Sequence, residues 1–274
     1  MKIIGPCWYN FIKYKDKIIH NFGDIHNKKT PCKGEGILFQ DWLDQFIETH
    51  KSEIVDVFFE LPLPKKTKPY ILDLKKSTNS YMKDTILYFL YCVTLINKKR
   101  HDMCKYKNAR FHMTDFRNNL LYDSVKAPNL NVENFVIALY YFLSFSKSKR
   151  DEIKEIFNNL CKNVEKEVKD LVDLEISTLF ELLAKEPNAE FDIKIARLAL
   201  LMDLFLLIRI CRTYSTQKRS DFNNESVSLA VSYTGVEHAK NLSLLFTKLG
   251  AEVSPPISRT DGKTGNLLQC VNLK

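Results

Sequence analysis

Residues 226–238 read SVSLAVSYTGVEH, and they decide the fold because an apolar strand runs directly into a turn and then a helix. Valine, leucine and tyrosine side chains alternate with serine and alanine, which places large side chains on one face of the strand and small ones on the other. A face of small residues lets a helix pack closely. Gly235 ends the strand, and residues 237–249 have the apolar spacing of a helix. This stretch therefore predicts a strand–helix unit.

The first third of the chain repeats the pattern of short apolar strands that stop at turns and are followed by helices. Strands are predicted at residues 17–22, 54–60 and 108–113, and helices at residues 37–50 and 83–97. Alternation of this kind predicts an α/β fold with a largely parallel central sheet flanked by helices. In such a sheet, ligands bind beyond the carboxyl ends of the strands.

The middle of the chain has a different character. Helices are predicted over residues 131–145, 150–183 and 192–213, where long apolar repeats run without a glycine. We interpret residues 119–215 as a large helical insertion that packs on the sheet. It separates two sheet-forming parts of a single domain, residues 1–118 and 222–253. The polar residues 254–274 are expected to form a loose tail.

The composition narrows the class of protein. Of the 274 residues, 45% are hydrophobic and 27% are charged, which excludes a disordered or fibrous chain. The net charge is +8, but the basic residues are spread along the chain and no nucleic-acid recognition motif is present. Nucleic acid is therefore the less expected partner, although the net charge does not exclude it, and the oligomeric state stays open. The longest apolar runs are too short to span a bilayer, so no membrane span is expected.

The seven cysteines show no Cys-x-x-Cys pair, which excludes a zinc ribbon and a thioredoxin motif. Their odd number and irregular spacing predict reduced, buried thiols in a cytosol-like compartment. The first ten residues lack the sustained apolar stretch of a signal peptide, so secretion is not expected.

Two predicted strands end in the same motif, Gly-x-x-His. The first motif ends at His26 and the second at His238. From this composition, roughly 0.2 occurrences of Gly-x-x-His are expected by chance, so two are unusual. Glycine permits a sharp turn at a strand end, and a histidine at a helix N-terminus stays neutral, as a general base or metal ligand must. The alternative is that both histidines are polar caps near the surface.

Two further strands bring polar residues to the same edge. Glu60 closes the apolar strand 54–60, where it is either a functional carboxylate or an ordinary solvated charge. Arg110 and His112 share one face of the strand 108–113, and a polar face implies solvent or a polar pocket. Arg110 and the nearby Arg117 are suited to binding a substrate carboxylate or phosphate, or alternatively to structural ion pairs.

The paired Gly-x-x-His motifs and the acidic strand end between them resemble the TraB/Tiki and erythromycin-esterase/ChaN-like superfamily. Residues 22–26, 55–60 and 231–238 carry the resemblance. It implies a sheet made of two related halves and a metal-dependent or His/Glu-based hydrolytic site. His26, Glu60 and His238 match the functional positions of the family. The first motif has Asp24 where the family has glutamate.

Two other segments, residues 109–117 and 203–212, resemble uncharacterised proteins of large nucleocytoplasmic DNA viruses. A viral protein of this kind is expected in the host cytoplasm or in the virion.

The function expected from these observations is hydrolysis of a peptide or ester bond in an unknown substrate. A divalent metal ion is the implied cofactor, with His26, Glu60 and His238 as ligands and with Arg110 and His112 in the same pocket. The alternative is a catalytically inactive viral structural or host-interaction protein on the same fold.

Overall fold

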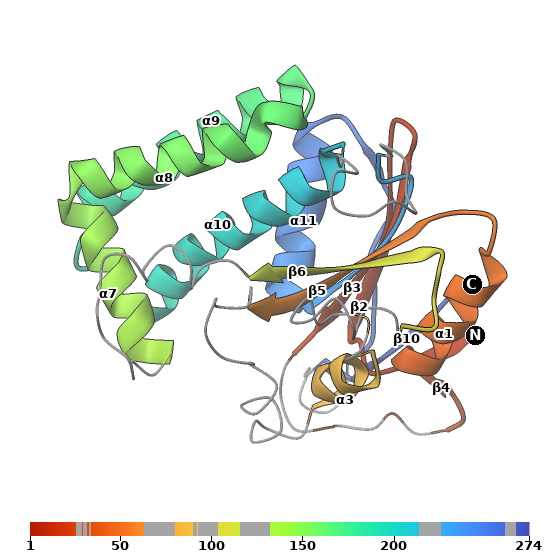
Figure 1. Ribbon diagram of the computed structural model, residues 1–274. Coiled ribbons are helices and arrows are strands. Elements are labelled where there is room, and N and C mark those ends of the chain that lie inside the picture. The colour runs from red at the N-terminus through yellow and green to blue at the C-terminus, as the bar shows by residue number, and fades with distance from the viewer. Residues whose placement is uncertain are drawn as a thin grey trace. The chain divides into compact units, whose positions relative to one another are not determined.

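The computed structural model describes residues 1–25, 29, 32, 34–62, 80–89, 92, 104–115, 132–213, 226–260 and 267–273 (Figure 1). The chain forms two compact units. The first unit comprises Met1–Thr114 and Val227–Lys274, and the second comprises Asp115–Ser226. β-Sheets form the centre of the first unit, and the described part of the second is mainly helical.

The main sheet of the first unit contains the four strands that the sequence predicts. Its order is β6 (Ala109–Asp115), β5 (Val55–Pro62), β7 (Leu229–Gly235), β3 (Lys17–Asp24), β2 (Trp8–Tyr14) and β8 (Glu252–Val253), with β9 (Ile257–Ser258) also paired to β2. The predicted strands β3, β5, β6 and β7 are therefore neighbours in one sheet, although they come from both ends of the chain.

The sheet is mixed, so the prediction of a largely parallel sheet is wrong. β7 is parallel to β3 and to β5, and the arrows of β5 and β6 point the same way in Figure 1. β2, in contrast, is antiparallel to β3, β8 and β9. Tyr14 pairs with Lys17, so only Lys15 and Asp16 form the turn between β2 and β3, and Lys15 has a φ of 54°. A turn this short can join only antiparallel strands.

A second, smaller sheet joins the two ends of the chain. Its order is β10 (Cys270–Asn272), β1 (Lys2–Ile4) and β4 (Ile37–Leu38). The C-terminal residues, where the sequence pattern predicts a loose tail, thus contribute β9 and β10. The physical reason is burial, because Cys270 and Val271 are shielded from solvent.

Helices cover both faces of the main sheet (Figure 1). On one face, Phe39 and Trp42 of α1 (Phe39–Thr49) pack against Tyr233 and Phe22, and α3 (Tyr81–Tyr88) contributes to the same apolar core. On the other face lies α11 (Val236–Lys248). It approaches so closely that a Cβ atom on Gly23 would lie 2.7 Å from the Cα of Val236. Only glycine, which has no side chain, permits this approach at position 23 of β3.

The second unit consists of α7 (Val132–Phe145), α8 (Lys147–Leu160), the 3₁₀ turn η1 (Cys161–Asn163), α9 (Lys166–Lys185) and α10 (Phe191–Cys211). The single helix predicted over residues 150–183 is interrupted, because Val164 and Glu165 have extended backbone conformations. Asn163 and the β-branched Val164 are weak helix formers, which is consistent with a break there. Across the described ranges, no helix combines the length and apolar character needed to cross a membrane.

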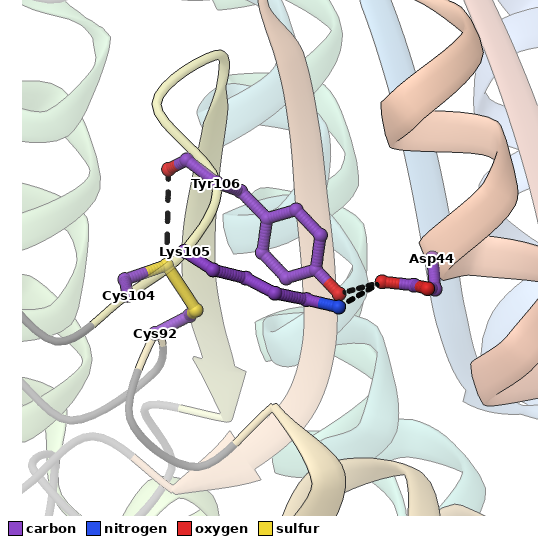
Figure 2. The surroundings of a disulfide bond; sticks show 5 residues. All are labelled: Asp44, Cys92, Cys104, Lys105 and Tyr106. Atoms are coloured by element: carbon purple, nitrogen blue, oxygen red, sulfur yellow. Dashed lines mark hydrogen bonds and ion pairs between the residues drawn. A yellow bond between two sulfur atoms is a disulfide. The ribbon is translucent and has the colours of Figure 1, made fainter.

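Four of the seven cysteines form disulfides, Cys32–Cys270 and Cys92–Cys104. The prediction of seven reduced thiols is therefore wrong for these four. Figure 2 shows Cys92–Cys104 next to Lys105 and Tyr106, whose side chains both bind Asp44 of α1. The remaining thiols, those of Cys7, Cys161 and Cys211, are buried. Irregular spacing hides this pairing, because sequence separations of 12 and 238 residues follow no local pattern.

Candidate functional site

The carboxyl ends of β3, β7 and β5 lie side by side at one edge of the main sheet. Asp24 at the end of β3 pairs with Gly235 at the end of β7, and Phe59 of β5 pairs with Tyr233 of β7. Glu60, which follows Phe59, therefore lies on the opposite side of β7 from Asp24. This is the edge at which parallel strands present ligand-binding residues.

Glu60 and His238 form a pair at this edge. His238 Nε2 lies 3.4 Å from Glu60 Oε1, and the two side chains are 10% and 13% exposed. The other carboxylate oxygen of Glu60 accepts a hydrogen bond of 2.6 Å from the backbone N–H of Gly235. Gly235 precedes α11 and has no side chain with which to cap it, so Glu60 supplies the anion at the helix N-terminus. Two of the residues expected at the site, Glu60 and His238, are thus in contact, with a carboxylate directed at an imidazole.

Asp24 is a second, fully buried carboxylate at the same edge. Its Oδ1 accepts hydrogen bonds from the Ile25 backbone N–H at 2.8 Å and from Gln269 Nε2 at 3.1 Å, and its Oδ2 accepts one from the Tyr233 hydroxyl at 3.3 Å. Burial, and then the charge of Asp24, raise the pKa of Tyr233 well above its usual value. The same two causes raise the pKa of the Cys7 thiol to about 12. Burial and the charge of Asp24 together favour the protonated form of both groups.

Arg110 and His112 belong to a different cluster, which lies on the edge strand β6 and near the amino end of β5. Both bind the buried Asp56 of β5: Arg110 donates from Nε at 2.7 Å and from a terminal nitrogen at 2.5 Å, and His112 Nε2 lies 2.6 Å from Oδ1. The His112 ring also stacks on Phe58. Burial alone would raise the pKa of Asp56, but the hydrogen bonds and charges of His112 and Arg110 lower it overall.

Asp56 is the residue that the sequence analysis missed. Its signal is present in the chain, since a carboxylate between Val55 and Val57 in an apolar strand needs a buried partner. The partner itself is not visible in the sequence, because Arg110 lies 54 residues away. Arg110 and His112 were expected in the pocket at the strand ends. In the structure both side chains instead contact the carboxylate of Asp56, four residues before Glu60.

The metal ligand set expected from the sequence falls partly outside the described residues. His26 and Arg117 are among the residues that the structure leaves undescribed, so only Glu60 and His238 of the three expected ligands can be placed. Within the described ranges, no group of three histidine, cysteine or acidic side chains is arranged to hold a metal ion. A catalytic metal generally needs three protein ligands, and the described residues provide two. They do not by themselves fit a metal ion.

Comparisons with protein-family models, with curated proteins and with solved structures find no match to this chain. The resemblance described above therefore depends on the strand-end motifs alone. The functional argument that follows is built on the chemistry of the side chains at the sheet edge.

Proposed function

We propose that the protein is a hydrolase of ester or peptide bonds whose reaction takes place at the carboxyl ends of β3, β7 and β5. The observation that carries the proposal is the contact between Glu60 and His238, two residues that lie 178 positions apart in the sequence and meet at one sheet edge. Apo catalytic pairs are often as loose as this 3.4 Å contact, and they tighten when substrate binds.

In the proposed reaction, His238 is the general base. Its imidazole takes a proton from a water molecule, and the water oxygen attacks the carbonyl carbon of the substrate. Glu60 orients the ring and stabilises its positive charge until the proton passes to the leaving group. The location supports these roles, since both side chains are mostly shielded from water yet retain some exposure.

The proposal does not use every residue expected in the pocket. Arg110 and His112 bind Asp56, and we assign them a structural role on that basis. A divalent ion held by His26, Glu60 and His238 remains an extension of the proposal that metal analysis can test, and no step above depends on it. That residues 119–215 form an insertion between the two sheet-forming parts of the chain is a further part of the proposal.

The test is a screen of purified protein against acyl esters and peptides, with and without a chelator. We expect Glu60→Gln and His238→Ala to lower the rate by roughly 10²–10⁴-fold, the usual contribution of a general base. Glu237→Gln is the matched control, because Glu237 lies next to His238 on α11 but is exposed and pairs with Lys240. Equal rates for wild type, Glu60→Gln and His238→Ala would contradict the proposal.

A second candidate, a non-catalytic viral interaction protein, is favoured by exposed aromatic side chains on α7. Tyr141, Phe142 and Phe145 are 40%, 39% and 67% exposed, and exposed apolar groups of this size are typical of binding surfaces. Of the two locations expected for a viral protein, the virion is the better supported, because disulfides persist on virion surfaces and are rare in the cytosol. Capture of a defined partner that Phe145→Ser abolishes would support this candidate over the hydrolase.

A further inference from the structure

The C-terminal segment reaches the sheet edge that carries the proposed site. β10 pairs antiparallel with β1, with Ile4 opposite Cys270, and the Gly5 backbone N–H donates to the Gln269 carbonyl at 3.0 Å. Gln269 is therefore held next to the end of β1. From there its side chain, which is fully buried, donates to Asp24 at 3.1 Å.

The contact between Gln269 and Asp24 differs from the other hydrogen bonds to this carboxylate. Ile25 directly follows Asp24 in the chain, and Tyr233 lies on the adjacent strand β7, so the main sheet itself positions both donors. Gln269 instead comes from a segment 245 residues away. Its position depends on β10, and β1 and β10 have only three residues each. Three residues are at the lower end of the usual length of a strand, so few backbone hydrogen bonds hold this segment in place.

A covalent bond provides that support. Cys270, the neighbour of Gln269, is joined to Cys32, and the bonded pair is 0% and 9% exposed. Cys32 follows Asp24 by eight residues, so the disulfide ties the C-terminal segment to the segment that leaves the end of β3. We propose that the Cys32–Cys270 disulfide is a covalent lock that holds Gln269 on Asp24, so that the sheet edge is complete only in the oxidised chain.

The chemistry of the lock is thiol–disulfide exchange. The bond forms when the two thiols give two electrons and two protons to a disulfide oxidant such as oxidised glutathione, which is released as two thiols. A dithiol such as dithiothreitol reverses the step and becomes a cyclic disulfide. Once formed, the bond is protected from scrambling, because exchange needs a thiolate. Burial is the main cause that raises the pKa of Cys7 to about 12 and that of Cys161 to about 11, and Cys211 is buried too.

Hydrogen exchange tests the lock without needing a substrate. We compare wild type with Cys32→Ser/Cys270→Ser, and use Cys92→Ser/Cys104→Ser as the matched control that removes the other disulfide. In the first variant we expect amides of residues 2–5 and 268–273 to exchange at least about tenfold faster, with α11 still protected as a sign of intact folding. The control is expected to leave exchange in these segments unchanged.

Reduction of the wild type with dithiothreitol provides a second route to the same state if the serine variant does not fold. The proposed lock would be overturned if the amides of residues 268–273 exchanged as slowly in Cys32→Ser/Cys270→Ser and in the reduced protein as they do in the oxidised wild type. A non-reducing peptide map of the wild type that contained no peptide linked through Cys32 and Cys270 would overturn it as well.

The consequence for catalysis rests on the proposed function, and one more variant separates the two claims. Gln269→Leu keeps the disulfide and removes an amide donor from Asp24, which lies at the same sheet edge as Glu60 and His238. We therefore expect normal exchange in β10 together with slower hydrolysis and an altered pH profile. If no hydrolysis is found in wild type but exchange responds as expected, the proposed function fails and the lock stands. If Gln269→Leu and the reduced protein hydrolyse substrate with the wild-type rate and pH profile, the role of the lock at the site is overturned.

Discussion

Strand β5 carries two carboxylates four residues apart on the same strand face, and they have contrasting surroundings. Asp56 is fully buried and binds Arg110 and His112, and both of these side chains are buried as well. Glu60 lies at the strand end, is 13% exposed, and contacts one imidazole and one backbone N–H. A fold depends on a buried charge and its partner together, because removing one of them is strongly destabilising, whereas a paired charge at the rim can still meet a substrate. We therefore assign stability to the first cluster and chemistry to the second.

The largest effect is expected from removing the buried carboxylate. Asp56→Ala removes the buried carboxylate that binds both Arg110 and His112, and breaking a buried ion pair from one side destabilises a protein by about 3–5 kcal/mol. Chemical denaturation measures the change in the free energy of unfolding. Glu53→Gln is the control, since Glu53 lies just before β5 and is exposed. A loss below about 1 kcal/mol would show that the cluster is not a structural element and would return Arg110 and His112 to the list of site candidates.

Acid is expected to produce a smaller effect on the same cluster. The pKa of Asp56 is lowered in the folded state, mainly because the interactions with His112 and Arg110 outweigh burial. The unfolded chain therefore binds the proton first as the pH falls, so this stabilisation is complete above about pH 5 and declines at lower pH, by up to about 1.4 kcal/mol per pH unit.

The measurement is the difference in unfolding free energy between wild type and Asp56→Asn from pH 7 to pH 3. Taking the difference cancels the contribution of His20, whose pKa is lowered to about 4 by burial and by His50 and which also destabilises the fold in acid. A difference that is constant with pH would contradict the role assigned to the Asp56 charge.

The contrast between the two clusters also explains what the sequence can predict. Strand ends are marked locally, because an apolar run stops at Gly23, at Pro62 or at Gly235, and these marks correctly placed β3, β5 and β7 in one sheet. Glu60 and His238 were found together for that reason.

Features that depend on distant partners were not predictable. β2 contains Asn10, a buried amide that reads as polar in the sequence, and its partners Asn21 and Ser243 are recognisable only after β3 and α11 have formed. The antiparallel turn at Lys15 contains no glycine or asparagine that would signal it. The Asp56 cluster and the disulfides likewise join residues whose proximity only the folded sheet creates.

The smallest stability effect is expected at the strand end, and it is the prediction that separates the two carboxylates most clearly. Glu60→Ala removes the acceptor for the Gly235 N–H at the start of α11, and loss of such a cap costs about 1 kcal/mol. Glu60→Gln should cost less, because its amide oxygen still accepts that bond. Thermal and chemical unfolding of both variants, measured beside Asp56→Ala, gives the comparison. If Glu60→Ala lost as much stability as Asp56→Ala, both carboxylates would be structural. A loss near 1 kcal/mol together with abolished hydrolysis would instead identify a residue that the fold tolerates losing and that the reaction requires.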